Sequence, residues 1–205
     1  MARIAPAFDT GVLQTADMSQ GDLINLDVGA ILAHCPEVSA GLSATTAALR
    51  TNCTVGQRLL ELVRLRIAFH NQCRSCMALR YTESVDDGLT EDLVCSLEKP
   101  YEAPGLSDSD RAALKFADLF ATDHLRIDDD IYDELRQHFS EAQLVEIGLN
   151  CALSVGIGRL AATWHAVDHV PLELQTAGEV TPWNIDGALA SASEATPRRS
   201  AADRT

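Results

Sequence analysis

Two cysteines separated by two residues, Cys73 and Cys76, are the residues of this chain best suited to chemistry. If they open a helix, the free N–H groups and the dipole of its first turn favour a thiolate over a thiol, most strongly at Cys73. Cys76 would lie on the same face, close enough to attack an oxidised Cys73 and close a disulfide. The spacing therefore predicts a pair that cycles between dithiol and disulfide.

The elements that must position this pair are helices. Residues 59–71 form an amphipathic stretch, and a polar break separates it from a second helix that begins at the cysteines. If that helix continued to Arg80, the arginine would lie within about 60° of both cysteines. Its permanent charge would then stabilise a thiolate.

One acid, Glu61, precedes the pair, and eleven residues separate it from Cys73. This arrangement resembles the core of the AhpD-like alkylhydroperoxidase branch of the carboxymuconolactone decarboxylase family. The apolar run 144–164 resembles the helix that follows in this family, so the likeness covers roughly residues 20–170. It implies an all-α helical-bundle subunit that assembles into a homo-oligomer, a trimer or a hexamer.

The resemblance also implies an activity and roles for residues. The CxxC pair would reduce a small-molecule peroxide, and a dithiol reductant, either a protein or a small dithiol, would reduce the pair again. Cys76 would be the thiol that meets the peroxide, although the helix-end argument makes Cys73 the more acidic one. Glu61 would orient water or accept a proton.

The family's proton relay is altered in this chain. Peroxidase members carry a histidine four residues after the second cysteine, where this chain has Arg80. Arginine can stabilise a thiolate or bind an anion, but it does not exchange protons at physiological pH. We therefore consider His70, three residues before the pair, as a substitute, with His165 and His169 as further candidates.

Each of these residues also has a purely structural interpretation. Glu61 has Arg58 and Arg64 three residues away on either side, so a surface salt bridge would explain it. The CxxC pair could be unreactive buried thiols or half of a zinc site, but no second CxxC or CxxH completes such a site in the sequence. We expect neither a metal nor a cofactor. The other four cysteines are expected to pack as small hydrophobic residues: Cys35, Cys53, Cys95 and Cys151.

The predicted function is that of a thiol-dependent oxidoreductase, an antioxidant enzyme of the alkylhydroperoxidase or peroxiredoxin type. A first alternative is a cofactor-free lyase or hydrolase acting on a lactone acid, as in the decarboxylase members of the family, with Arg64, Arg80 or Arg159 holding the carboxylate. A second alternative is a non-catalytic redox sensor in which oxidation of the pair changes a helix contact.

Composition narrows the partners and the location. A length of 205 residues with 46% apolar content suits one globular domain with a sizeable core. The net charge of −14 argues against nucleic acid and anionic membrane surfaces as partners. The sequence has six cysteines but shows neither a secretory segment nor an uninterrupted apolar run long enough to cross a bilayer. This combination favours the cytoplasm.

The chain is expected to be helical nearly throughout. Two capping boxes predict helix starts, Ser107 with Asp110 and Ser140 with Gln143. We divide the chain into a flexible N-terminal arm (1–19), the AhpD-like helical domain (20–175) and a mostly disordered C-terminal tail (176–205).

Overall fold

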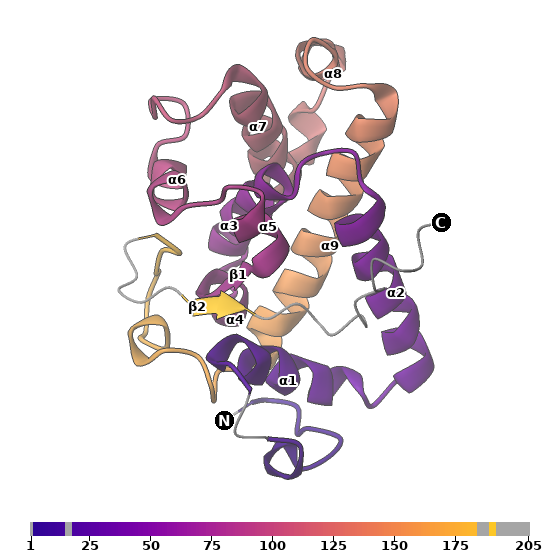
Figure 1. The fold of residues 1–205 in the computed structure, drawn as a ribbon, viewed down its shortest axis with the longest axis vertical. Coiled ribbons are helices and arrows are strands. Elements are labelled where there is room, and N and C mark those ends of the chain that lie inside the picture. The colour runs from indigo at the N-terminus through magenta and orange to yellow at the C-terminus, as the bar shows by residue number, and fades with distance from the viewer. Residues whose placement is uncertain (1, 15–17, 184–188, 192–205) are drawn as a thin grey trace.

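The computed structural model describes residues 2–14, 18–183 and 189–191, the last three by their backbone only (Figure 1). Within these residues the regular structure is almost entirely helical, which confirms the all-α prediction. The α-helices are α1 (Gln20–Leu32), α2 (Pro36–Asn52), α3 (Gln57–Asn71), α4 (Arg74–Ala78), α5 (Thr82–Asp86), α6 (Glu91–Cys95), α7 (Asp108–Thr122), α8 (Asp129–Arg136) and α9 (Glu141–Trp164). Four short 3-10 helices and two strands complete the set: η1 (Thr10–Val12), η2 (Ser96–Glu98), η3 (His124–Arg126), η4 (Leu172–Leu174), β1 (Leu79–Tyr81) and β2 (Leu189–Ser191).

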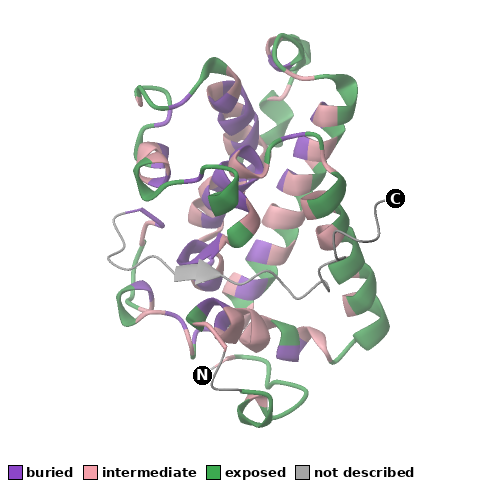
Figure 2. Ribbon diagram, viewed as in Figure 1, coloured by how far each residue is buried: buried purple, intermediate pink, exposed green. Residues whose placement is uncertain are grey.

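Helix α3 lies at the centre of the fold, packed against both α7 and α9. Leu62, Val63, Leu65 and Ile67 are completely buried, so apolar residues cover more than one face of this helix. Figure 2 shows the same concentration of buried residues along α3 and α7, whereas α2 at the edge of the molecule has none. A helix buried on several sides is a rigid base for residues that it presents to its neighbours.

Local capping signals predict the helix starts correctly. Ser107 with Asp110 forms a complete capping box at α7, and Ser140 with Gln143 does so at α9. In each box the serine side chain accepts from the backbone N–H three residues on, while that residue's side chain accepts from the serine N–H.

Helix α9 is long and apolar enough, by length and composition alone, to cross a membrane, which the sequence analysis did not anticipate. It packs against α3, α7 and α8 along one side, where Leu144, Ile147 and Cys151 are buried. Asn150, which interrupts the apolar run, donates to the carbonyl of Leu60 at 3.0 Å and ties α9 to α3.

The helix that begins at the cysteines is much shorter than predicted. It ends at Ala78, and the chain continues as β1, paired in parallel with β2 so that Arg80 lies opposite Ala190. Side chains take the groups that a longer helix would pair: Arg64 donates to the carbonyl of Cys76, and the N–H of Tyr81 donates to Glu61. The prediction that Arg80 shares a helical face with the cysteines is therefore wrong.

The chain termini make more contacts than a loose arm and tail would. Within the arm, the N–H of Ala7 donates to the carbonyl of Ala30 at 2.8 Å. At the other end, Trp183 is 5% exposed with its ring centroid 5.0 Å from that of Phe69. Residues 176–183 thus contact the helical domain, the mostly disordered tail stays a prediction, and 184–188 and 192–205 lie outside the described residues.

Candidate functional site

The CxxC pair lies at the junction between α3 and α4. Gln72 ends α3 in the left-handed conformation (φ 50°), and its side-chain amide donates to the carbonyls of Phe69 and Val180. These bonds hold a backbone conformation that non-glycine residues seldom adopt. Cys73 then caps the N-terminus of α4, where its Sγ lies 3.3 Å from the backbone N of Cys76.

The two cysteines form a disulfide, as the CxxC spacing predicted, with their Cα atoms 5.2 Å apart. Their surroundings differ. Cys73 is completely buried, whereas Cys76 is half-buried and lines a cavity. A molecule that reaches the pair through this cavity therefore meets Cys76 first.

The cavity has a volume of about 240 Å³ and lies between α1, α2, α3 and α9. Most of its wall is aliphatic. The polar groups of the wall include Glu61, Arg64, Arg50 and Tyr81, all on the same cavity as Cys76. Representative apolar lining residues are Ile24, Val28, Leu42, Leu49, Leu153 and Ile157.

Glu61 and Arg64 form a paired unit on α3. Arg64 Nε and one of its terminal nitrogens each donate to a Glu61 carboxylate oxygen at 2.6 Å. The Glu61 side chain is 2% exposed and that of Arg64 is 14% exposed, so this is a buried ion pair and the surface interpretation is wrong. Burial by itself lowers the pKa of Arg64, but the charge and hydrogen bonds of Glu61 outweigh it and raise that pKa.

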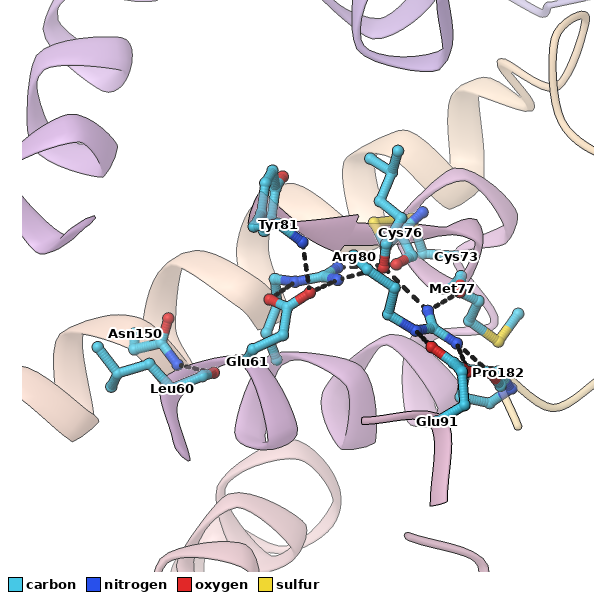
Figure 3. Close-up of polar contacts among 12 residues, drawn as sticks. Leu60, Glu61, Cys73, Cys76, Met77, Arg80, Tyr81, Glu91, Asn150 and Pro182 are labelled. Atoms are coloured by element: carbon cyan, nitrogen blue, oxygen red, sulfur yellow. Dashed lines mark hydrogen bonds and ion pairs between the residues drawn. A yellow bond between two sulfur atoms is a disulfide. The ribbon is translucent and has the colours of Figure 1, made fainter. Parts of the chain in front are cut away.

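The same unit holds the chain around the disulfide. Arg64 donates to the carbonyl of Cys76 at 2.7 Å and to that of Leu79 at 2.9 Å, and the N–H of Tyr81 donates to Glu61 at 3.3 Å (Figure 3). Sequence reasoning named Arg64 only as a salt-bridge partner or carboxylate holder. Its i+3 spacing from Glu61 was the available signal, but the contact with Cys76 depends on the turn between α3 and α4.

Arg80 does not face the disulfide. Its guanidinium is 2% exposed and points toward Glu91 and Pro182, away from the sulfurs (Figure 3). It also donates to the carbonyls of Met77 and Leu79 at 2.8 and 2.9 Å. These contacts assign Arg80 to holding β1 and the C-terminal segment, which corrects the predicted role of sustaining a thiolate.

His70 is directed away from the cavity as well. Its Nε2 lies 2.6 Å from an oxygen of Asp118 on α7, which also accepts from Arg66 at 2.7 Å and from the Tyr101 hydroxyl at 2.8 Å. Burial would raise the pKa of Asp118, but the hydrogen bonds from His70 and Arg66 and the charge of Arg66 bring it below its usual value. The structure therefore does not bring His70 to the cysteines.

The remaining candidates also lie outside the cavity lining. His165 caps α9 in the left-handed conformation, and His169 bonds to Asp27 through Nδ1 at 2.9 Å. Arg159 donates to Asn71 and to the carbonyl of Ala121. Of the three arginines considered as carboxylate holders, Arg64 alone lines the cavity.

Sequence reasoning missed a second pair on the cavity wall, Arg50 and Tyr81. The Arg50 guanidinium carbon lies 3.9 Å from the centroid of the Tyr81 ring. The two residues come from α2 and β1, so no local spacing indicated their contact. Within the described part of the chain, no group of three or more histidines, cysteines or acids is arranged to hold a metal ion.

Comparisons with known proteins identify the fold but not the activity. No family model matches the chain. The chain is similar to a crystal structure from Agrobacterium tumefaciens, of a protein of unknown function that is described as a candidate antioxidant defence protein AhpD. The TM-score is 0.59 with 23% identity, over 69% of this chain and 95% of that one. The chain therefore has an AhpD-like fold.

Curated relatives match only part of the chain. Two uncharacterized proteins from strains of Mycobacterium tuberculosis are each 36% identical over 89 residues, which is 42% of this chain and 31% of each relative. The uncharacterized protein YdfG of Bacillus subtilis is 25% identical over 97 residues, or 47% of this chain and 66% of its own length. The matches thus span about a third of the Mycobacterium proteins and just under two thirds of YdfG.

Proposed function

We propose that this protein is a thiol peroxidase of the alkylhydroperoxidase type that uses Cys73 and Cys76 as its redox pair. The proposal rests on one observation: Cys76 of the disulfide and the buried acid Glu61 line the same largely apolar cavity. The AhpD-like fold supports it. The substrate would be an organic hydroperoxide, because an aliphatic wall favours an apolar molecule over a small polar one.

The reaction begins on the reduced protein. The Cys76 thiolate attacks one oxygen of the hydroperoxide, the O–O bond breaks, and an alkoxide leaves and takes up a proton to become an alcohol. Cys76 becomes a sulfenic acid. The Cys73 thiolate then attacks the Cys76 sulfur, the S–O bond breaks, and hydroxide leaves and takes up a proton to become water while the disulfide forms.

A dithiol of the cell returns the protein to its reduced state. One thiolate of the donor attacks Cys76, the more accessible sulfur, and releases Cys73 as a thiolate. The second donor thiol then attacks the mixed disulfide, so that the donor leaves as its own disulfide and Cys76 is reduced. Such a cycle requires a reducing compartment, in agreement with the expected cytoplasmic location.

Glu61 serves this reaction in two ways in our proposal. Its pairing with Arg64 fixes the backbone of Cys76, because the same guanidinium bonds to both. Its position on the cavity wall lets a carboxylate oxygen orient a water molecule or accept a proton next to the cysteine. Arg80 and His70 have no part in the chemistry, since neither lines the cavity.

Assembly into a homo-oligomer is proposed on the resemblance, and large apolar side chains exposed on α9 offer a surface for it. They are Val145 at 61%, Leu149 at 48% and Leu160 at 44% exposure.

Steady-state consumption of cumene hydroperoxide with excess small dithiol tests the function. We expect turnover by the wild type and a loss of about a hundredfold or more in Cys73→Ser and in Cys76→Ser. Cys35→Ser should not change turnover, because Cys35 is an exposed cysteine that forms no disulfide. Undiminished turnover in Cys76→Ser would refute the mechanism. Disulfide formation without turnover would instead favour a redox sensor, and thiol-independent cleavage of a lactone acid would favour the lyase.

A further inference from the structure

We propose that the preferred substrate is an aliphatic hydroperoxide that also carries a carboxylate, and that Arg50 binds this carboxylate. The inference rests on the proposed function and specifies its substrate class. Three features of the cavity carry it: its aliphatic wall, the charge balance of its lining, and the free edge of the Arg50 guanidinium.

The size of the cavity limits the aliphatic part of the substrate. Its volume of about 240 Å³ is a little below the roughly 300–1,000 Å³ of pockets that hold drug-sized ligands. An aliphatic chain of short to medium length would bury its surface there against leucines and isoleucines of α1, α2 and α9. The cavity therefore suits a medium-chain molecule.

Charged side chains of the cavity lining leave one positive charge uncompensated. The charged residues among those lining the cavity are Arg50, Glu61 and Arg64. Glu61 and Arg64 neutralise each other through two hydrogen bonds, and Arg64 gives further hydrogen bonds to backbone carbonyls. Arg64 is thus committed to the protein, which leaves Arg50 as the cation available to a ligand.

Arg50 is held in place without using its hydrogen-bonding edge. Its guanidinium stacks on the face of Tyr81 at 3.9 Å, an interaction that involves the flat side of the group. No hydrogen bond or ion pair joins its N–H groups to another of the described residues. A stacked arginine with a free edge matches the two oxygens of a carboxylate.

The position of Tyr81 connects this binding point to the reacting sulfur. Tyr81 presents its ring to Arg50 while its backbone N–H donates to Glu61, which lines the cavity together with Cys76. A substrate anchored by its carboxylate at Arg50 would therefore extend its aliphatic chain along the wall and bring its hydroperoxide to Cys76. In a chain with a net charge of −14, a local cation of this kind favours the binding of an anion.

The test compares a hydroperoxy derivative of octanoic acid with its methyl ester, which differs in lacking the negative charge. We expect the wild type to prefer the acid in kcat/KM, and Arg50→Gln to lower the acid-to-ester ratio about tenfold, the size expected for losing a hydrogen-bonded charge. Arg50→Lys should retain part of the preference. Arg136→Gln, which removes an exposed cation of α8, is the matched control and should leave the ratio unchanged.

Calorimetric titration of the oxidised protein with octanoate separates this inference from the proposed function, because it needs no turnover. Binding by the wild type that weakens about tenfold in Arg50→Gln, and not in Arg136→Gln, would support the carboxylate site even if no hydroperoxide is consumed. Equal kcat/KM for acid and ester in the wild type, or octanoate binding that does not depend on Arg50, would overturn it while leaving peroxidase activity to be judged by the cysteine variants.

Discussion

The side chain of Arg64 donates a 2.7 Å hydrogen bond to the backbone carbonyl of Cys76, so a buried arginine of α3 holds the residue that we propose reacts with peroxide. The arginine is itself fixed by Glu61, one turn earlier on the same helix. Because α3 is buried on several sides, the disulfide is positioned by the rigid core and not by the surface loops around it.

The buried Glu61–Arg64 pair should therefore be a large contributor to stability. Glu61→Gln leaves Arg64 without its counter-charge, and we expect a loss of about 3 kcal/mol in the free energy of unfolding. Urea unfolding at neutral pH measures it. Glu141→Gln is the control, since Glu141 pairs with Arg136 at the surface with 76% of its side chain exposed, and it should change stability little. Similar losses in both variants would contradict a buried, organising pair.

Different burial of the two cysteines predicts different reactivity. After reduction, Cys76 should react with iodoacetamide about tenfold or more faster than Cys73, because Cys73 is completely enclosed. Peptide mapping by mass spectrometry at timed intervals gives both rates. Exposed Cys35 is the fast reference, and Cys151, whose pKa burial raises to about 12, is the unreactive one. Faster modification of Cys73 would contradict access through the cavity.

Two glycines of α9 should respond to alanine in opposite directions. A Cβ at Gly158 would lie 2.6 Å from the side-chain nitrogen of Asn71, which donates to the carbonyl of Ser154 at 2.9 Å. Displacing Asn71 breaks that bond and the one it accepts from Arg159. This loss of about 2 kcal/mol exceeds the roughly 0.5–1 kcal/mol that alanine gains in a helix, so Gly158→Ala should destabilise by about 1 kcal/mol. Gly156 has open space around its Cβ position, and Gly156→Ala should stabilise by about 0.5–1 kcal/mol. Thermal unfolding that shows the same sign for both would refute this packing.

Acid should weaken the contribution of Asp118. Its pKa lies below the usual 3.8, so the stability it supplies is fully present above about pH 4 and is lost as the pH falls through the folded-state pKa. The loss in the free energy of unfolding caused by Asp118→Asn, measured with urea, should accordingly be similar from about pH 5 to pH 7. It should shrink below about pH 4. A cost that is the same at low and neutral pH would show that the carboxylate charge is unimportant there.

Local patterns in the sequence predicted the parts of the site that neighbouring residues form. The cysteines lie three residues apart, and the disulfide depends on little else. Capping boxes were equally reliable, because each joins residues only three positions apart. Glu61 and Cys76 line one cavity, and only one helix and one turn separate them in the chain.

The rest depended on contacts between distant segments. Arg80 was assigned to the cysteines on the assumption of a continuous helix, but side chains from α3 pair with backbone groups that such a helix requires. His70 was assigned by its nearness in sequence, whereas Asp118, 48 residues further on, holds its ring. Arg50 and Tyr81 were missed for the same reason, since only the packing of α2 beside β1 brings them together.

The most direct test of the account is to trap the oxidised cysteine. Cys73→Ser, reduced and treated with one equivalent of cumene hydroperoxide, should form a stable sulfenic acid at Cys76 because the resolving thiol is absent. Labelling with dimedone and peptide mapping should then find the adduct on Cys76, and Cys76→Ser treated in parallel should carry none at Cys73. An adduct on Cys73, or no adduct in either variant while the peroxide is consumed, would contradict the assignment of Cys76 as the peroxidatic residue.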